Sequence, residues 1–416
     1  MAQQARAWSD FDRWSTHPGT GATPEGLISV FRGAEAGWLS RQADLFDDLI
    51  ENDGHLRSLI ESRISAVSGK EWVIQPGAQD AASIDAAAKL EEVLRDSLNF
   101  HEFIEHQLTA PYFGYAASEI DWREDDRNLT VPSWFANAPH ARFVLGALGE
   151  LRLFNEGDNG EGIELAAGKW VVTTMRHRNL ARAGLMRTAA WWAVFKRMSV
   201  RDWVIFAEKF GIPHVTGRYQ ENSSPEARAA LEQAIRDIGE GGQAVLSELT
   251  EIVISDIAQR GGDISSLHPG VVALCEAQMS KLINGATQNV ETGTAGSYAQ
   301  ARVHQARAFS LELADATRLS HVFRQHVGVP FVAYNGGMGG ARPPRLHIRV
   351  VQEMDPETRV RVASVLANEL GAELDGSQLL DELGYKKPAR PEDALRGTKA
   401  GPTDIAPKPS EGPKNG

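Results

Sequence analysis

The chain has 416 residues, 42% of them hydrophobic and 24% charged, which is typical of a folded protein with enough apolar side chains for a sizeable core. Its formal net charge of −12 argues against a protein that coats nucleic acid through a basic surface, although it does not exclude one that lets nucleic acid slide past. The single cysteine, Cys275, excludes an internal disulfide and a cysteine-based zinc site and fits a reducing compartment. No apolar run approaches a membrane span and the N-terminus lacks a secretory signal, so we expect a soluble protein, cytosolic or bound in an assembly, with no membrane contact.

The first quarter of the chain is predicted to be mainly helical. Residues 1–25 are polar and rich in glycine, proline and threonine, which predicts a loose N-terminal arm. Helical periodicity starts near Pro24 and stops at Gly69, and a short strand follows over 71–76. Two further helices are predicted over 80–98 and 99–113.

The pattern changes from Tyr115 to about Met175, where short strand-like runs are separated by turns. Four glycines and several acidic residues between Glu156 and Gly168 indicate a loop between strands. We therefore predict a small β-rich insert between two long helices.

The stretch from Gly184 to Tyr219 holds three of the ten tryptophans and predicts a helix of about seven turns, or two collinear ones. Gly211 and Pro213 end it. Apolar residues at spacings near three or four form one face: Leu185, Trp192, Phe195, Met198, Trp203, Phe206 and Phe210. Basic residues lie between them: Arg187, Lys196, Arg197, Arg201 and Lys209.

Further helices and a tail are predicted after this stretch. A helix after Ser224 and a strand-like run EIVISDI precede another helix over 269–290. A loop rich in threonine and glycine over 285–296 leads into a long helix over 297–327. Residues 355–383 are helical, and the Pro-, Gly- and Lys-rich tail from Lys386 is predicted to be disordered or a tether.

Three patterns that are typical of enzymes fail on spacing. His101 and His106 are five positions apart, so one face of a helix cannot bring both to one zinc ion. The run Gly162 to Lys169 has one residue too many between its glycines for a phosphate loop, and Trp170 replaces the hydroxyl that would meet magnesium. Acidic pairs without a third ligand are better explained as solvated turns: Glu119 with Asp121 and Asp125 with Asp126. We expect no catalytic residue, no metal site and no cofactor.

The order of features along the chain resembles the Mu-type portal proteins of tailed bacteriophages and Mu-like prophages. The resemblance is carried by several stretches: GLISVFRGAEAGWLSRQADLFDDLIENDGHLRSLIESRISAVSGKEWVI, FGYAASEIDW, GKW, the stretch from Gly184 to Tyr219, LINGATQNVETGTAGSYAQARVHQARAFSLELADATRL and FVAYNGG. None of them is a catalytic signature, so the specificity of the resemblance comes from their collinear order.

The resemblance implies an α+β, predominantly helical portal fold with a wing, a two-helix stem, a small α/β clip and a crown. It also implies a homo-oligomeric ring, dodecameric in the capsid, at one capsid vertex of the virion, assembled in the host cytoplasm. Double-stranded DNA would pass through the ring without sequence-specific binding. The expected protein partners are the terminase large subunit, which would hydrolyse ATP, the head–tail connector or neck proteins, and the major capsid and scaffold proteins.

Under this resemblance each segment receives an expected place in the portal fold. The body of the ring would come from the wing, the stem, the clip and the crown, and the two ends of the chain would lie outside it. The expected segments are an arm (1–25), the first part of the wing (26–96), the first stem helix (97–113), the clip (114–178), the second stem helix (179–214), the rest of the wing (215–350) with its tunnel loop (285–296) and long helix (297–327), the crown (351–385) and the tail (386–416).

An acidic ring with a few basic residues would centre DNA without holding it, because DNA carries about one charge per 1.7 Å. For the channel wall the candidates are Lys196, Arg197 and Arg201, unless they form a solvated face or pair with acids of a neighbouring subunit. Gln288, Asn289, Thr292 and Thr294 would form a neutral constriction, or else an ordinary surface loop. The candidates for motor contact, with burial inside the clip as the alternative, are Trp134, Phe135 and Phe143.

Two other classes of protein stay open. An adaptor or minor head protein would also lack catalytic motifs, but it would normally be shorter and lack the helix–insert–helix order. A DNA-processing enzyme would assemble its site from residues distant in sequence.

Overall fold

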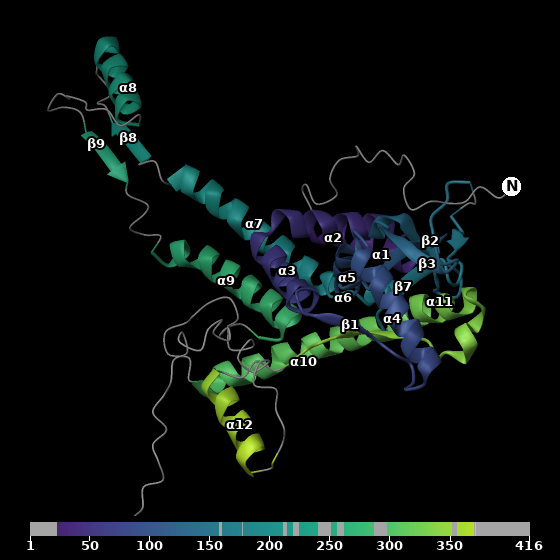
Figure 1. Cartoon of the computed structure of the whole chain (residues 1–416). Helices are drawn as coiled ribbons and strands as arrows, with labels where there is room; N and C mark the ends of the chain where they lie inside the picture. The colour runs from purple at the N-terminus through teal and green to yellow at the C-terminus, as the bar shows by residue number, and fades with distance from the viewer. Residues whose placement is uncertain are drawn as a thin grey trace, which may run out of the picture. The chain divides into compact units, whose positions relative to one another are not determined.

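Figure 1 shows the computed structural model of the chain, which describes residues 23–157, 160–176, 178–210, 214–218, 224–239, 251–255, 262–286, 298–351, 356–369 and 371. The chain divides into two units, Met1–Val351 and Gln352–Gly416. In the second unit the described residues are helix α12 (Pro356–Glu369) and Gly371. Most of the predicted arm and the whole of the tail from residue 386 therefore lie outside the described residues.

Three helices open the described chain: α1 (Pro24–Glu35), α2 (Ser40–Asn52) and α3 (Gly54–Ser68). The Thr23 hydroxyl caps α1 by accepting from the backbone N–H of Gly26 at 3.2 Å, and Pro24 occupies the first turn as predicted. Asp53 caps α3 by accepting from the N–H groups of His55 and Leu56, both at 3.0 Å. Apolar faces of these helices build one core with α7 and α9, through residues such as Phe31, Phe46, Leu56, Met186 and Met279.

The predicted strand after Gly69 is β1 (Trp72–Gln75), and its partner lies far along the chain. It pairs antiparallel with β10 (Arg345–Ile348), with Ile74 opposite Leu346. Side chains that alternate along β10 are buried and exposed in turn, so Leu346 and Ile348 face the core while Arg345 and His347 face outwards.

The helix predicted over 99–113 is divided into α5 (Phe100–Gln107) and α6 (Ala110–Phe113), after α4 (Ala81–Asp96). Pro111 has no N–H to donate to the carbonyl of Gln107, which interrupts the helical hydrogen bonds at this point. Gly114, at φ 96°, ends α6 in the left-handed conformation that glycine tolerates. The prediction of one continuous helix here was wrong.

Two antiparallel sheets follow, with strand orders β3-β2-β7 and β4-β5-β6. Their strands are β2 (Tyr115–Glu124), β3 (Thr130–Asn137), β4 (Phe143–Leu145), β5 (Leu151–Leu153), β6 (Ile163–Glu164) and β7 (Trp170–Thr174). The first sheet shares a core with α4, α5 and α10, where the Phe135 ring stacks on Phe103 at 4.3 Å between centroids. The β-rich segment is therefore part of the main body, and not the separate lobe that a clip over 114–178 would need.

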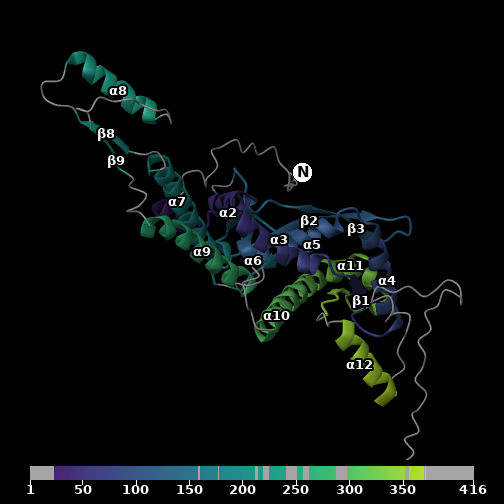
Figure 2. The ribbon, with the colours of Figure 1, turned by 90° about the vertical axis from the view of Figure 1, so that its left-hand side faces the viewer.

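The long helix α7 (Met186–Phe210) confirms the predicted helix, and it lies beside α9 (Gly262–Asn284) in both Figure 1 and Figure 2. Between these helices the chain forms β8 (His214–Arg218), α8 (Pro225–Gly239) and β9 (Glu251–Ser255). Strand β8 pairs antiparallel with β9, and α8 packs against β8. A small α/β unit is thus carried between two neighbouring helices.

The helix predicted over 297–327 is α10 (Tyr298–Phe323), which continues into a π-helical turn (Arg324–Gly328) and then α11 (Val329–Tyr334). Pro330 explains the wider turn, because its ring would clash with the carbonyl of His326 in a regular α-helix. A Cβ atom on Gly328 would lie 2.2 Å from the Pro344 carbonyl oxygen, so only glycine lets the chain before β10 approach this turn.

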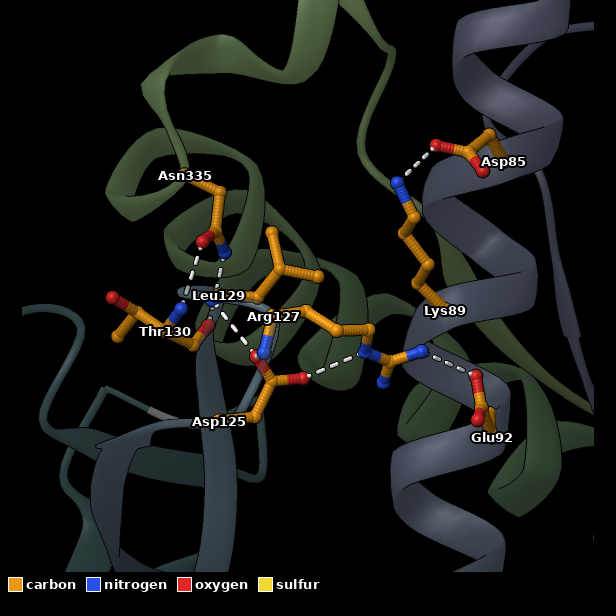
Figure 3. Close-up of polar contacts among 8 residues, drawn as sticks. All are labelled: Asp85, Lys89, Glu92, Asp125, Arg127, Leu129, Thr130 and Asn335. Atoms are coloured by element: carbon orange, nitrogen blue, oxygen red, sulfur yellow. Dashed lines mark hydrogen bonds and ion pairs between the residues drawn. The ribbon is translucent and has the colours of Figure 1, made fainter.

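Polar contacts attach the β2–β3 hairpin to two other elements (Figure 3). Asn335 acts like a strand partner for Thr130: it accepts from the Thr130 N–H at 2.8 Å and donates to the Thr130 carbonyl at 2.9 Å. Arg127 pairs with Glu92 of α4 at 2.8 Å and with Asp125 in its own turn. The Leu129 N–H, which donates to the Asp125 carboxylate, is the main reason for the lowered pKa of Asp125.

We expect Asn335→Ala to lower the free energy of unfolding by about 1–3 kcal/mol, because it leaves the part-buried Thr130 backbone groups without their partners. Urea denaturation measures the change. Lys89→Ala is the control: it removes only the exposed pair with Asp85 on α4 and should cost less than about 0.5 kcal/mol. Equal losses in the two variants would contradict the role of Asn335.

A buried histidine, His140, and a half-buried one, His106, meet beside α6. The His140 ring stacks on Phe113 at 3.7 Å between centroids, and its Nε2 lies 2.8 Å from the Thr109 hydroxyl. The His106 Nε2 lies 3.1 Å from the Ala117 carbonyl oxygen. Burial lowers the pKa of His106 to about 4 and that of His140 well below its ordinary value. Both rings are therefore neutral in the folded protein near pH 7.

The unfolded chain binds a proton at His106 at a higher pH than the folded chain does, because the pKa is lowered only in the folded state. The free energy of unfolding should therefore decrease as the pH drops from 6.5 towards 4. We expect His106 to account for about 3 kcal/mol of this loss. Denaturant titrations at several pH values measure it. In His106→Gln the loss over this window should be smaller by that amount, whereas His101→Gln on the exposed side of α5 should behave like the parent. An unchanged pH profile in His106→Gln would contradict the prediction.

Candidate functional site

The candidate site is the α7–α9 helical pair together with the ends of the chain segment that joins α9 to α10. Along the first half of α7 small side chains are fully buried, among them Ala189, Ala190 and Ala193. Short side chains let α7 lie close to α1, α2 and α9. Met279 and Ile283 of α9 complete this apolar contact.

Lys196 forms the main ionic contact between these helices. Its Nζ lies 2.9 Å from an Asp53 carboxylate oxygen and 2.8 Å from a Glu276 carboxylate oxygen. Burial opposes the charged form, but the two carboxylates outweigh it and raise the pKa of Lys196. The side chain is only 15% exposed. The prediction that Lys196 lines a channel therefore does not fit: its charge is held inside the subunit, where it links α7 to the start of α3 and to α9.

Arg197 and Arg201 stay at the surface. Arg197 lies 3.9 Å from Asp48, and Arg201, at 65% exposure, pairs with its neighbour Asp202 at 2.9 Å. Arg201 and Asp202 are both exposed, and an exposed pair of this kind contributes little to stability. Both side chains can still meet another molecule, so their place in a channel stays a prediction.

The second half of α7 exposes apolar side chains that the described part of the chain leaves uncovered. Val200 is followed three and four positions later by Trp203 and Val204, so the three lie on one side of the helix, and they are 38–52% exposed. We call these three residues the α7 strip. Clustered exposed apolar side chains usually mark a contact with another macromolecule. The periodicity of the sequence pointed to Trp203 as part of an apolar face, but it could not tell a core face from an exposed one.

The predicted constriction residues Gln288, Asn289, Thr292 and Thr294 lie outside the described residues, but the chain on both sides of them is described. On one side Arg63 of α3 donates to the Ile283 carbonyl at 2.6 Å and pairs with Asp315 of α10 at 2.9 Å. Arg307 of α10 donates to the Gly285 carbonyl at 3.0 Å. Two arginines thus fasten the end of α9 to α3 and α10.

Arg63 was not among the residues predicted for the site, although the sequence carries a signal for it. Leu56, Ile60 and Val67 recur on one buried face of α3, and Arg63 stands at an apolar position between them. A charged residue on a core face indicates a buried partner, and Asp315, at 5% exposure, is that partner.

Of the three aromatic residues predicted to contact the motor, two are core residues. Phe135 and Phe143 are fully buried, so for them the alternative of burial is the one that applies. Trp134, on β3 opposite Asp121, is 44% exposed and is the one of the three that another protein could reach.

The acidic pairs considered for metal chemistry are engaged within the chain. Glu119 pairs with Lys169 at 2.7 Å, and Asp121 pairs with Arg123 at 2.8 Å. Lys169 lies just before β7 with no helix after it, which is not the context of a phosphate loop. Among the described residues no group of three His, Cys, Asp or Glu side chains could hold a metal ion, and no described helix has the length and apolar character of a membrane span.

We expect Arg63→Leu to lower the free energy of unfolding by about 3–5 kcal/mol, because it leaves the Asp315 carboxylate buried without its main partner. Arg57→Leu on the same helix removes only an exposed pair with Glu61, so it should cost less than about 1 kcal/mol. Thermal and urea unfolding of both variants measure the difference. A loss in Arg63→Leu no larger than in Arg57→Leu would show that the contact does not fasten these helices.

A family profile described as the portal protein of Mu bacteriophage matches residues 43–385. The portal protein of Escherichia phage Mu is 30% identical over 329 residues, which cover 78% of this chain and 63% of the phage protein. The Mu-like prophage FluMu protein gp29 of Haemophilus influenzae is 27% identical over 390 residues, 90% of this chain and 70% of that protein. A chain in the solved virion of a native gene transfer agent particle has the same fold, with a TM-score of 0.53 at 13% identity over 89% of this chain and 97% of that chain.

Proposed function

The chain belongs to the portal protein family of Mu bacteriophage, and from this membership we propose that it is one subunit of a ring through which double-stranded DNA enters and leaves a capsid. The family places the chain among structural proteins and not among enzymes. Neither an adaptor protein nor a DNA-processing enzyme fits a family match over residues 43–385.

The observation that carries the proposal is the α7–α9 pair with an α/β unit between its helices. A portal subunit needs a stem of two helices and a clip between them. We assign the stem to α7 and α9, and the clip to 214–255, in place of the expected stem helix 97–113 and clip 114–178. We assign residues 114–178 to the wing, because their first sheet, β3-β2-β7, is buried against α4, α5 and α10. Residues 351–385 keep their proposed place in the crown.

The α7 strip supports ring formation. Stem helices in a ring pack against their own partner and against the next subunit, so an apolar surface beyond the α7–α9 contact is expected. The half-buried Trp191 and Trp192, by contrast, already contact Phe31 and Phe195 inside the subunit. We propose a dodecameric ring in the capsid whose neighbours contact each other through the α7 strip.

The proposed partners follow from the ring. The terminase large subunit would dock at the clip, neck proteins would attach to the ring, and the major capsid and scaffold proteins would surround it at one vertex of the virion after assembly in the host cytoplasm. Trp134 lies on β3, outside the reassigned clip, so it is not assigned to motor contact. DNA would pass an acidic subunit, with Arg197, Arg201 and the neutral residues of 285–296 as the proposed channel contacts.

We expect rings with a central hole in negative-stain images of the purified protein, and Val204→Glu to abolish them, because it places a charge in the apolar contact between subunits. Leu148→Glu is the control: Leu148 is 95% exposed in the turn between β4 and β5, and rings should persist. Circular dichroism checks that both variants fold. A monomer under all conditions would contradict the proposed function, whereas normal rings in Val204→Glu would contradict only the role of the α7 strip.

A further inference from the structure

A groove of about 600 Å³ lies between the β1–β10 strand pair and α10, away from the α7–α9 pair. Its strand wall carries Gln75, Arg345 and His347, and its helix wall carries Thr317, Ser320, His321 and Arg324. The floor includes Ala316 and Ile348, which belong to the main core.

The local geometry explains why these polar groups converge. Arg345 and His347 are two positions apart on β10, so both lie on its outer face. Thr317, His321 and Arg324 recur at spacings of four and three, so they share one face of the helix. The opposite helix face, with Leu319 and Phe323, is buried in the core. Strand and helix therefore each present one polar, cationic wall.

The groove is positive within an acidic chain. Two guanidinium groups, two imidazoles and two hydroxyls line it, and no carboxylate does. Arg345 donates to the Gln75 side-chain oxygen at 3.2 Å. Within the described part of the chain, no ion pair engages Arg324 or Arg345, whereas arginines on other surfaces, such as Arg57, Arg95 and Arg123, each pair with a carboxylate. The two groove arginines thus keep their charge available for an outside anion.

The two walls are held at a fixed separation. Arg324 begins the π-helical turn that Pro330 imposes, and the chain entering β10 touches the same turn where Gly328 meets Pro344. The pairing of β10 with β1 fixes the strand from its other side. A preformed site loses less conformational entropy when it binds.

We propose that this groove binds the phosphodiester backbone of duplex DNA. Guanidinium groups and hydroxyls are the donors that proteins direct at phosphate and sugar oxygens, and arginine can bind a phosphate through two parallel hydrogen bonds. An acidic protein segment fits less well, because the lining has no tryptophan or tyrosine to anchor a protein partner. The identification of the polyanion as DNA rests on the proposed function.

The experiment measures binding of a short fluorescent DNA duplex to the full chain by anisotropy over a salt series. The double variant Arg324→Gln, Arg345→Gln should bind more weakly, and its slope of log K against log salt should be shallower by about two, one unit for each lost phosphate contact. The control variant Arg57→Gln, Arg123→Gln loses the same charge from paired surface sites and should keep the parent slope.

An unchanged slope in the groove variant would overturn the proposal. A labelled poly-glutamate chain provides a second arm: if its binding depends on the two groove arginines and that of the duplex does not, the ligand is an acidic polypeptide and the assignment to DNA is wrong. Negative-stain images of the same samples separate this proposal from the proposed function. If rings form but the salt slope is unchanged in the groove variant, only DNA binding by the groove is refuted. If the parent protein forms no rings, the proposed portal function is refuted.

Discussion

The buried ion pair between Arg63 and Asp315 is the contact on which the arrangement of the helices depends. The Arg63 side chain is 10% exposed and the Asp315 side chain 5% exposed. Removing two such charged groups from water is costly, so they are tolerated only when their hydrogen-bonding groups find partners. Arg63 meets that need with the Asp315 carboxylate and the Ile283 carbonyl, and Arg318 adds a contact at 3.3 Å to the other Asp315 oxygen. The body, the end of α9 and the middle of α10 are therefore fixed together, and so is the start of the segment between α9 and α10.

The long helices could be read from periodicity, and the family could be recognised from the order of its motifs. Pattern could not reveal which elements become neighbours. Alternation over β2 and β3 predicts strands, but whether Phe135 is buried in a clip or in the wing depends on α5 and α10, which are distant in sequence. The same holds for Lys196, since a helical wheel of α7 contains neither Asp53 nor Glu276. The break at Pro111, in contrast, was visible in the sequence.

The distribution of cations follows from the same reasoning. Many lysines and arginines of this acidic chain form ion pairs inside the subunit, as Lys196 and Arg187 do. A surface of this kind repels a polyanion over most of its area and leaves a few places where an anion can bind. For a conduit this balance favours passage over retention, because each additional phosphate contact strengthens binding and slows movement.

The pairing of β1 with β10 also has a consequence for synthesis on the ribosome. Residues 72–75 find their described strand partner at 345–348, so the core that contains Ile74, Leu346 and Ile348 is completed only after most of the chain has been translated. Contacts so distant in sequence form slowly. The helical pair and its α/β unit, which are encoded between these two strands, emerge before that core closes. A nascent subunit thus exposes its α7 strip while its body is unfinished, and partly folded chains with exposed apolar surface are prone to associate.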